Sequence, residues 1–400
     1  MALPFATNPA LKTLPVYQPG RPIEEVAREL GLAPESIIKL ASNENPLGPS
    51  PLALRAMRQA LAEVNLYPDG NAFYLKQKLA QKLGVTPAHL LLGNGSNEVL
   101  ELLGHALLPW RAQAGPEPIR EFARASAPGP VHDELAETRT AVSTDAEVVV
   151  SQYCFAVYPI VTALFGAKLV VVPAANYGHN LQAMLRAITP NTRIVFVANP
   201  NNPTGTTASP AELDAFIKAV PSNVVVALDE AYIEFLDQPL DLLPEIRAGS
   251  HPNLVLMRTF SKIYGLAGVR LGYGIGHPEF IAELEKLRQP FNINSVAQAG
   301  ALAALDDTAH AEKTRRINSR GLKLCARAFR KLGLEFIPSG ANFILVRVGD
   351  GQRVFEGVQK LGVIVRPMGG YQLPEWVRIS MGTPKQNQRC LDALKTVLGK

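Results

Sequence analysis

Short apolar runs alternate with longer amphipathic stretches through the middle of the chain. The apolar runs span residues 90–92, 147–151, 168–173, 193–198, 223–228 and 254–257. Between several of them, apolar positions recur with the spacing of a helix, as in 180–188 and 211–220. Strands separated by helices of about ten residues are typical of βαβ units. The pattern therefore predicts an α/β fold with a mostly parallel sheet between layers of helices.

The pattern changes after about residue 290, where helices come first and strands follow. Helices are expected at 296–305 and 307–332, and strands at 336–337, 342–348, 363–367 and 376–380. This order predicts a smaller α+β domain. Residues 1–50 are irregular and proline-rich apart from a helix at 23–30, and they are expected to join it. The expected division is therefore 1–50, 51–290 and 291–400.

A segment at about 111–145 interrupts the large domain. It is rich in proline, alanine and charged residues, with one short helical stretch near 119–125. Loops this long inside a compact domain are uncommon and are either disordered or functional. Two interpretations stay open here, a solvated surface excursion and a lid or partner-binding element.

Composition excludes several classes of protein. With 47% hydrophobic and 19% charged residues among 400, the chain is typical of globular proteins. A net charge of +5 without any Lys/Arg block argues against nucleic-acid binding. The three cysteines lack metal-ligand spacing, which predicts a reducing compartment and no metal site. The first residues do not resemble a signal peptide, and no apolar run approaches a membrane span, so a cytoplasmic protein is expected.

The stretch 253–274 carries the most reactive candidate. Its apolar run is followed by Thr259, Ser261 and then Lys262, the only lysine between positions 218 and 286. Desolvation or a neighbouring cation lowers the pKa of such a lysine and frees its amine for Schiff-base chemistry. Arg270 could supply that cation while it binds a phosphate beside the two hydroxyls. The alternative is a lysine at a strand end with its head in water.

Two further motifs follow apolar runs, at positions where parallel sheets collect ligands. Gly95, Ser96 and Asn97 begin a helix after a glycine turn, so their free N–H groups form a potential anion site. Asp229 closes the run 224–228, where an unpaired carboxylate would be costly. A cationic partner is expected there.

Four separated motifs together resemble a known family. They are Leu40-Ala-Ser-Asn-Glu-Asn-Pro-Leu-Gly-Pro49, Asn199-Pro-Asn-Asn-Pro-Thr-Gly205, Asp229-Glu-Ala-Tyr232 and Ser261-Lys-Ile-Tyr-Gly-Leu-Ala-Gly-Val-Arg-Leu-Gly-Tyr273. The last is similar to the lysine motif of fold-type I aminotransferases, which depend on pyridoxal phosphate. In their order, the four resemble histidinol-phosphate aminotransferases over nearly the whole chain except the insert. The resemblance implies a three-layer α/β/α large domain, which holds the cofactor, and a smaller α+β domain.

The resemblance also implies roles at the cofactor. Lys262 would form the aldimine and move the α-proton, and Asp229 would keep the pyridine nitrogen protonated. Asn202 and Tyr232 would bind the phenolic oxygen, and Phe155 would stack on the ring, although plain core packing is an open alternative for Phe155. The phosphate would be anchored by Gly95, Ser96, Asn97, Thr259, Ser261, Arg270 and, from a neighbouring subunit, Tyr67. A homodimer with shared active sites follows.

For the substrates, the resemblance implies a ping-pong transamination in histidine biosynthesis. Glutamate and imidazole-acetol phosphate would give 2-oxoglutarate and L-histidinol phosphate. Arg378 and Asn43 are candidates for a carboxylate, and Arg366 with Tyr17 for the substrate phosphate. An aminotransferase for aromatic amino acids and a pyridoxal-phosphate-dependent decarboxylase of phospho-amino acids remain alternatives. A non-catalytic binding protein is disfavoured, because it would not need both Lys262 and Asp229.

Overall fold

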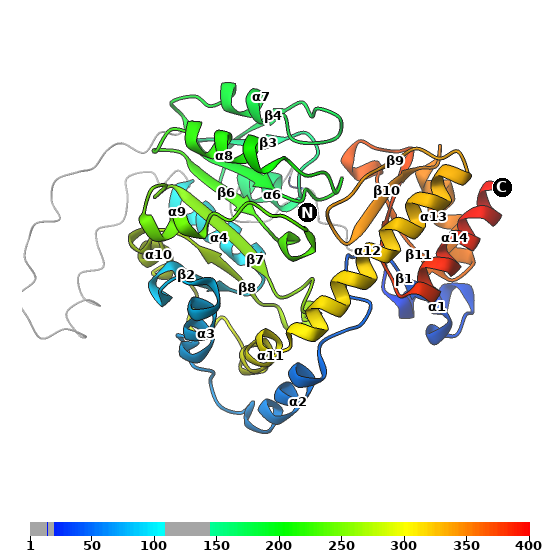
Figure 1. The fold of residues 1–400 in the computed structure, drawn as a ribbon, viewed down its shortest axis with the longest axis horizontal. Coiled ribbons are helices and arrows are strands. Elements are labelled where there is room, and N and C mark those ends of the chain that lie inside the picture. Colours follow the sequence, from blue (N-terminus) through cyan, green and yellow to red (C-terminus); the bar gives the residue numbers. More distant parts are fainter. Residues whose placement is uncertain (1–13, 15–19, 109–144) are drawn as a thin grey trace, which may run out of the picture.

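The computed structural model describes residues 14, 20–108 and 145–400. A seven-stranded sheet forms the centre of the larger body (Figure 1). In spatial order its strands are β2 (Leu90–Gly93), β8 (Gly272–Ile275), β7 (Leu254–Thr259), β6 (Val225–Asp229), β5 (Thr192–Ala198), β3 (Glu147–Ser151) and β4 (Lys168–Val172). In this sheet β8 alone runs opposite to the common direction of the other strands. The prediction of a mostly parallel α/β sheet is confirmed.

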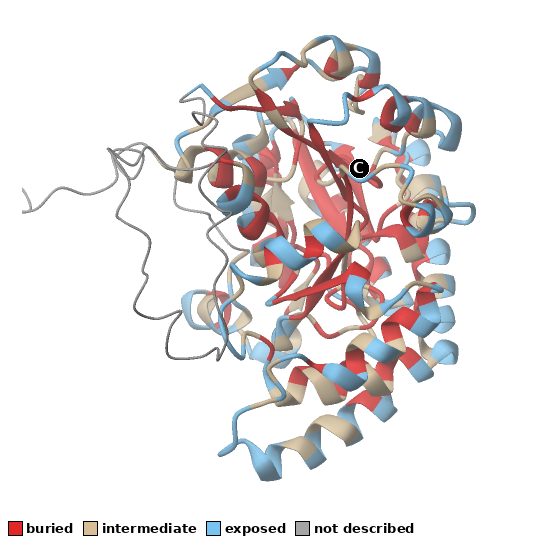
Figure 2. Ribbon diagram, turned by 90° about the vertical axis from the view of Figure 1, so that its left-hand side faces the viewer, coloured by how far each residue is buried: buried red, intermediate tan, exposed pale blue. Residues whose placement is uncertain are grey.

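Each face of this sheet has its own apolar core, because successive strand side chains point to opposite faces. Along β6, Val225 and Ala227 join one cluster, whereas Val226 and Leu228 join the other. The first cluster is covered by α4 (Ser96–Leu107), α6 (Val157–Leu164) and α10 (Pro278–Glu285). The second is covered by α3 (Phe73–Leu83), α7 (Leu181–Arg186), α8 (Pro210–Ala219), α9 (Leu243–Ala248) and α11 (Ser295–Asp306). Figure 2 shows the buried strands between helices whose outer sides are exposed.

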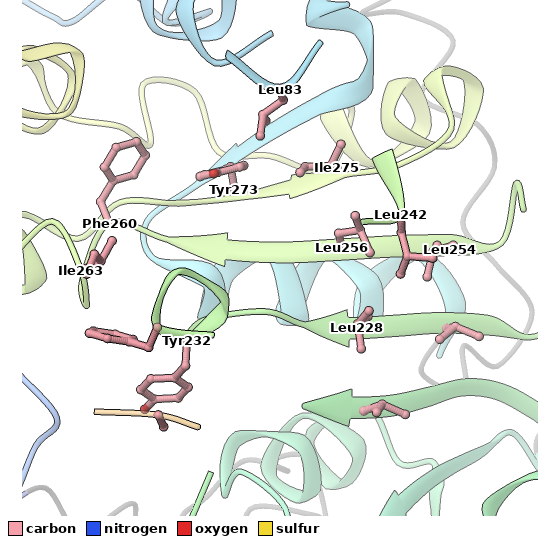
Figure 3. Packing of buried hydrophobic residues seen from close by; sticks show 14 of the residues in the cluster. Leu83, Leu228, Tyr232, Leu242, Leu254, Leu256, Phe260, Ile263, Tyr273 and Ile275 are labelled. Carbon is pink, nitrogen blue, oxygen red and sulfur yellow. The ribbon is translucent and has the colours of Figure 1, made fainter. Parts of the chain in front are cut away.

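The carboxyl ends of β6 and β7 point the same way (Figure 3). Leu228 and Leu256 lie within these strands, while Tyr232, Phe260 and Ile263 lie beyond their ends. The residues that follow β6 in the chain therefore lie beside the residues that follow β7.

The smaller body is built on a four-stranded antiparallel sheet, with order β12 (Arg366–Pro367), β13 (Trp376–Ser380), β10 (Phe343–Arg347) and β9 (Phe336–Ile337). Helices α12 (Thr308–Lys331), α13 (Gly351–Lys360) and α14 (Pro384–Leu398) contribute to its core. The long α12 runs from beside α11 across to this body (Figure 1).

The N-terminal segment packs against the smaller body. After α1 (Ile23–Leu30), β1 (Ile38–Lys39) pairs in parallel with β11 (Val363–Ile364), as Figure 1 also shows. The chain then returns to the larger body, where α2 (Pro51–Ala60) packs against α11.

Some sequence expectations differ in detail or fall outside the described residues. The helix α2 ends at Ala60, and the chain continues as a short 3₁₀ turn over Leu61–Glu63. Val171, in a run expected to be buried, is exposed because β4 lies at the edge of the sheet. The helix expected near 119–125 lies outside the described residues, as does Tyr17. Among the described helices, none combines the length and apolar character needed to cross a membrane.

Candidate active site

A cavity of about 260 Å³ lies where β5, β6 and β7 end and where the smaller body meets them. Residues named from the sequence line it: Asn43, Ser96, Asn97, Phe155, Asn202, Asp229, Tyr232, Thr259, Ser261, Lys262, Arg270, Arg366 and Arg378. They come from segments more than 300 residues apart. The parallel strands explain the convergence, because their carboxyl ends share one edge of the sheet.

Lys262 lies in a tight turn immediately after β7. The turn is closed by a hydrogen bond from the Gly265 N–H to the Lys262 carbonyl, at 3.1 Å. Gly265 has φ +69°, and a side chain there would place its Cβ 2.2 Å from the carbonyl oxygen of Gly48. Asn45 Nδ2 donates to the Ile263 carbonyl at 2.8 Å and holds the turn from the other side. The lysine is thereby anchored by backbone contacts to the N-terminal segment.

Asp229 ends β6 and is nearly fully buried. Its Oδ2 accepts a hydrogen bond from the Tyr158 hydroxyl at 2.7 Å, and its Oδ1 accepts one from the Ala231 N–H at 3.0 Å. Burial raises the pKa of the Asp229 carboxyl, while these hydrogen bonds and the positive charge of Lys262 oppose the rise. A further cation beside this carboxylate would favour its ionised form.

Next to Asp229 in the chain, a buried ion pair links the end of β6 to β7. Arg258 Nε donates to Glu230 Oε2 at 2.7 Å, and both side chains are largely shielded from water. Burial raises the pKa of Glu230, and the positive charge of Arg258 opposes that rise. Glu230 follows Asp229 in the chain, and Arg258 precedes Thr259. The ion pair therefore fixes the positions of Asp229 and Thr259, which both line the cavity, relative to each other.

Tyr232 is a buried residue close to Lys262. The Lys262 Nζ is 5.5 Å from the centroid of its ring, and its hydroxyl accepts a hydrogen bond from Asn43 Nδ2 at 2.9 Å. Burial raises the pKa of Tyr232 to about 12. The hydroxyl therefore stays protonated at neutral pH and keeps a hydrogen to donate into the cavity.

Positive charge and N–H groups gather at the start of α4. Gly95 has φ +78°, and a Cβ there would lie 2.2 Å from an Arg270 guanidinium nitrogen, so only glycine allows this approach. Arg270 Nη1 donates to Ser261 Oγ at 3.4 Å, and Thr259 Oγ1 donates to the same oxygen at 3.0 Å. One guanidinium, two hydroxyls and a helix N-terminus form a donor set that fits a phosphate.

The smaller body contributes two arginines to the lining of the cavity. Arg366 and Arg378 are directly opposite each other on β12 and β13, so they share one face of that sheet. Arg378 Nη1 donates to Asn202 Oδ1 at 2.6 Å, and Nη2 donates to the Ala41 carbonyl at 3.0 Å. Its guanidinium also lies 5.1 Å from the ring centroid of Phe343. These contacts aim a buried, permanently charged group at the cavity.

Three sequence-predicted residues, Tyr67, Tyr17 and Gly95, are not among those that line this cavity. Tyr67 is 82% exposed and stacks on Phe291 at 4.7 Å between ring centroids. Tyr17 lies outside the described residues. The backbone turn at Gly95 lets the Arg270 guanidinium approach the start of α4. Phe155 does line the cavity, where its ring meets Tyr158 edge-on at 5.7 Å.

Sequence reasoning left other contributors without a role. Tyr158 binds Asp229, and Glu44 and Tyr371 line the cavity. Glu44 sits inside the motif 40–49 and could have been found there. Tyr158 ends an aromatic-x-x-Tyr pattern that begins at Phe155, but this pattern does not reveal its contact with Asp229, which is distant in the chain. Tyr371 carries no local signal.

Comparison with known proteins places this fold and cavity in a class. The family model for aminotransferases of class I and II matches residues 132–394, and the chain belongs to this family. Aspartate aminotransferase from Thermus thermophilus shares the fold, with a TM-score of 0.76 at 20% identity, over 98% of this chain and all of that one.

Relatives of nearly the same length narrow the family to the histidinol-phosphate aminotransferases. The protein of that name from Akkermansia muciniphila is 47% identical over 399 residues, which is 100% of both chains. One from Pseudomonas fluorescens is 46% identical and covers 98% of this chain and 97% of its own. A crystal structure of the Sinorhizobium meliloti protein, in complex with pyridoxal-5'-phosphate, has a TM-score of 0.82 at 28% identity, over 100% of this chain and 98% of that one.

Proposed function

We propose that this aminotransferase uses pyridoxal 5'-phosphate to transfer an amino group between L-glutamate and imidazole-acetol phosphate, forming L-histidinol phosphate in histidine biosynthesis. One observation carries the proposal. A single cavity is lined by Lys262, Asp229, a phosphate-binding donor set and two arginines that lie opposite each other on paired strands. The names of the relatives with 46–47% identity support the same substrate.

When bound, pyridoxal phosphate supplies an aldehyde that captures an amine and a ring that accepts electrons from the Cα–H bond. The donor set around Arg270 would hold the phosphate. The buried carboxylate of Asp229 would stabilise positive charge on the ring nitrogen, which offsets the cost of burying that carboxylate. Tyr232 would donate its hydroxyl hydrogen to the ring oxygen. Asn202 would lie beside it, and Phe155 would cover one ring face.

Lys262 would carry the proton transfers. Its amine lies among buried groups, close to the Tyr232 ring, at the end of a turn held by backbone contacts. A positioned amine of this kind can take a proton from the substrate Cα and return it to another atom, as a general base and then a general acid.

The two arginines would receive the anionic groups of the two substrates. Glutamate carries an α-carboxylate that histidinol phosphate lacks, and histidinol phosphate carries a phosphate. Arg378 would bind the carboxylate through its planar fork, together with Asn43, which lines the same cavity. Arg366, with Tyr17, would bind the phosphate. The substrates would then take turns in one cavity, which gives ping-pong kinetics.

Half-reactions test the substrate. The visible absorbance of the loaded enzyme is followed after mixing with L-histidinol phosphate, and separately with phenylalanine. Faster conversion by histidinol phosphate supports the proposal. Fast conversion by phenylalanine with slow conversion by histidinol phosphate would instead identify an aromatic aminotransferase.

Arg366→Ala is expected to lower kcat/KM for histidinol phosphate by about 10- to 100-fold, the value of hydrogen bonds to a charged group. The effect on glutamate should be several-fold smaller, because its carboxylates do not occupy the phosphate position. Both half-reactions would be measured by stopped flow. Arg347→Ala, which removes an exposed arginine paired with Glu335 and Glu375, is the matched control. Equal losses in the two half-reactions would reject the proposal that Arg378 binds the carboxylate and Arg366 binds the phosphate.

We further propose a homodimer with shared active sites. A row of large apolar side chains is exposed along the segment from α2 to α3, although monomeric proteins rarely expose such contiguous patches. The row comprises Leu52, Leu54, Leu61, Val64, Leu66, Tyr67, Phe73 and Tyr74. Phe291 is also exposed and stacks on Tyr67. A second copy seated on this surface would cover it and bring Tyr67 to the phosphate of the other chain.

Mixing two defective variants tests the sharing. Lys262→Ala and Tyr67→Ala homodimers are each expected to show low activity. If Tyr67 acts across the interface, subunit exchange creates one complete site per mixed dimer and restores about a quarter of wild-type activity. If the mixture shows only the activity expected from the two variants measured separately, Tyr67 acts in its own subunit's site or has no role in the reaction. Each variant mixed with itself is the control.

Two further proposals concern the cellular compartment and the limits of the domains. The three cysteines are free and buried, which supports a reducing, cytoplasmic compartment. The domain limits 51–290 and 291–400, with 1–50 joining the smaller domain, are supported by the separate sheets and by the pairing of β1 with β11.

A further inference from the structure

A second hollow lies outside the active site, along the side of α12. It has a volume of about 410 Å³ and is bordered by the segments 235–237 and 336–340. The residues that line it are different from those that line the active-site cavity. We call it the α12 groove. The established aminotransferase activity gives it no role.

One wall of the α12 groove is strongly cationic. Lys323, Arg327 and Arg330 are exposed and lie on one face of α12, at i, i+4 and i+7. Within the described ranges, no carboxylate forms an ion pair with any of these three. Asp237, the carboxylate at the groove's edge, is already bound by Arg315 at 2.7 Å. The wall therefore offers net positive charge to a ligand.

The floor of the groove is apolar and contains an aromatic ring. Leu322, Phe336 and Ile344 line it, and the Arg330 guanidinium lies 5.2 Å from the Phe336 ring centroid. A flat ring could pack on such a surface by stacking against the planar guanidinium or the aromatic face.

A buried polar side chain that also lines the groove has one hydrogen-bond acceptor left unused among the described residues. Asn318 is 7% exposed, and its Nδ2 donates to the Ala341 carbonyl at 3.1 Å. Its Oδ1 is buried without a hydrogen-bond partner among the described residues. Buried acceptors are normally satisfied, so this oxygen is suited to an N–H donor on a ligand.

We propose that the α12 groove is a second binding site, for a phosphate monoester attached to a flat, N–H-bearing ring, the chemistry of a nucleoside monophosphate. Three cations on one wall exceed what a single carboxylate needs and suit a dianionic phosphate. The apolar floor takes the ring, and Asn318 Oδ1 takes the ring's N–H. The wall, the floor and the acceptor each match one part of the ligand.

Calorimetry on the holoenzyme tests this site, with AMP as the probe at one ionic strength. The double variant Lys323→Ala/Arg327→Ala is expected to weaken AMP binding by about tenfold or more. Arg316→Ala/Arg320→Ala removes the same charge from exposed positions of the same helix outside the groove, and should change binding by less than about twofold. Circular dichroism would confirm that both variants fold.

Three results would overturn the proposal. The first is AMP binding that is displaced by L-histidinol phosphate, which would place the nucleotide in the active site. The second is equal weakening in the two double variants, which would mean unspecific attraction to a basic helix. The third is inorganic phosphate or adenosine binding as tightly as AMP, which would remove the need for both parts of the ligand. Because no active-site residue is changed, failure here leaves the proposed transamination intact.

Discussion

Lys262→Ala is expected to lower transamination by ~10⁴-fold or more, because it removes the group proposed to move the proton. The turn that carries Lys262 is held by backbone contacts, so the fold should survive the change. The measurement is single-turnover conversion of L-histidinol phosphate by the reconstituted variant. Added small amines should restore part of the rate if the loss is chemical.

Two controls separate chemistry from charge. Lys218→Ala removes an exposed lysine paired with Asp214 and should leave the rate unchanged. Lys262→Arg keeps the positive charge but replaces the amine with a group that cannot lose its proton at neutral pH. If Lys262→Arg retains most of the activity, the lysine serves as a fixed charge and the proposed mechanism is wrong.

Asp229→Asn is expected to weaken cofactor binding and turnover by about 10²- to 10³-fold, as when one partner of a buried ion pair is removed. The asparagine keeps the size of the side chain and can still accept a hydrogen bond from Tyr158. What it loses is the negative charge that would stabilise a protonated ring nitrogen. Cofactor affinity would be measured by fluorescence titration, and turnover at saturating cofactor.

The expected pattern for Asp229→Asn includes rescue. A cofactor analogue whose ring nitrogen is permanently charged should recover part of the lost rate, because it no longer needs the carboxylate to hold a proton. Asp214→Asn, at an exposed ion pair, is the control. Unchanged cofactor affinity and turnover in Asp229→Asn would show that this carboxylate does not face the ring.

Much of the larger body could be predicted because its strands and helices alternate regularly along the chain. The positions of Asp229 and Lys262 followed from the same pattern, since residues after parallel strands share one edge of the sheet. The reversed direction of β8 could not be read in this way. A short apolar strand has the same pattern in either direction, and only its neighbours β2 and β7 decide its orientation.

The contacts that the sequence did not reveal join distant parts of the chain. Tyr158 reaches Asp229 across 71 residues, and Asn43 reaches Tyr232 across 189. Asn43 and Tyr232 each lie in a sequence motif, but neither motif shows that the two side chains meet. Tyr67 illustrates a different limit, because it is exposed in the single chain and the role proposed for it requires a second copy.

During synthesis on a ribosome, the parallel pairing of Ile38 and Lys39 with Val363 and Ile364 must wait for almost the whole chain to emerge. At ~5–20 residues per second, this delay is on the order of tens of seconds. Val26 and Ile37, which end up buried beside Ile364, stay exposed to water throughout. The first segment of the nascent chain is therefore a natural client for a holding chaperone. A premature stop codon before residue 363 would leave β1 without the strand with which it pairs.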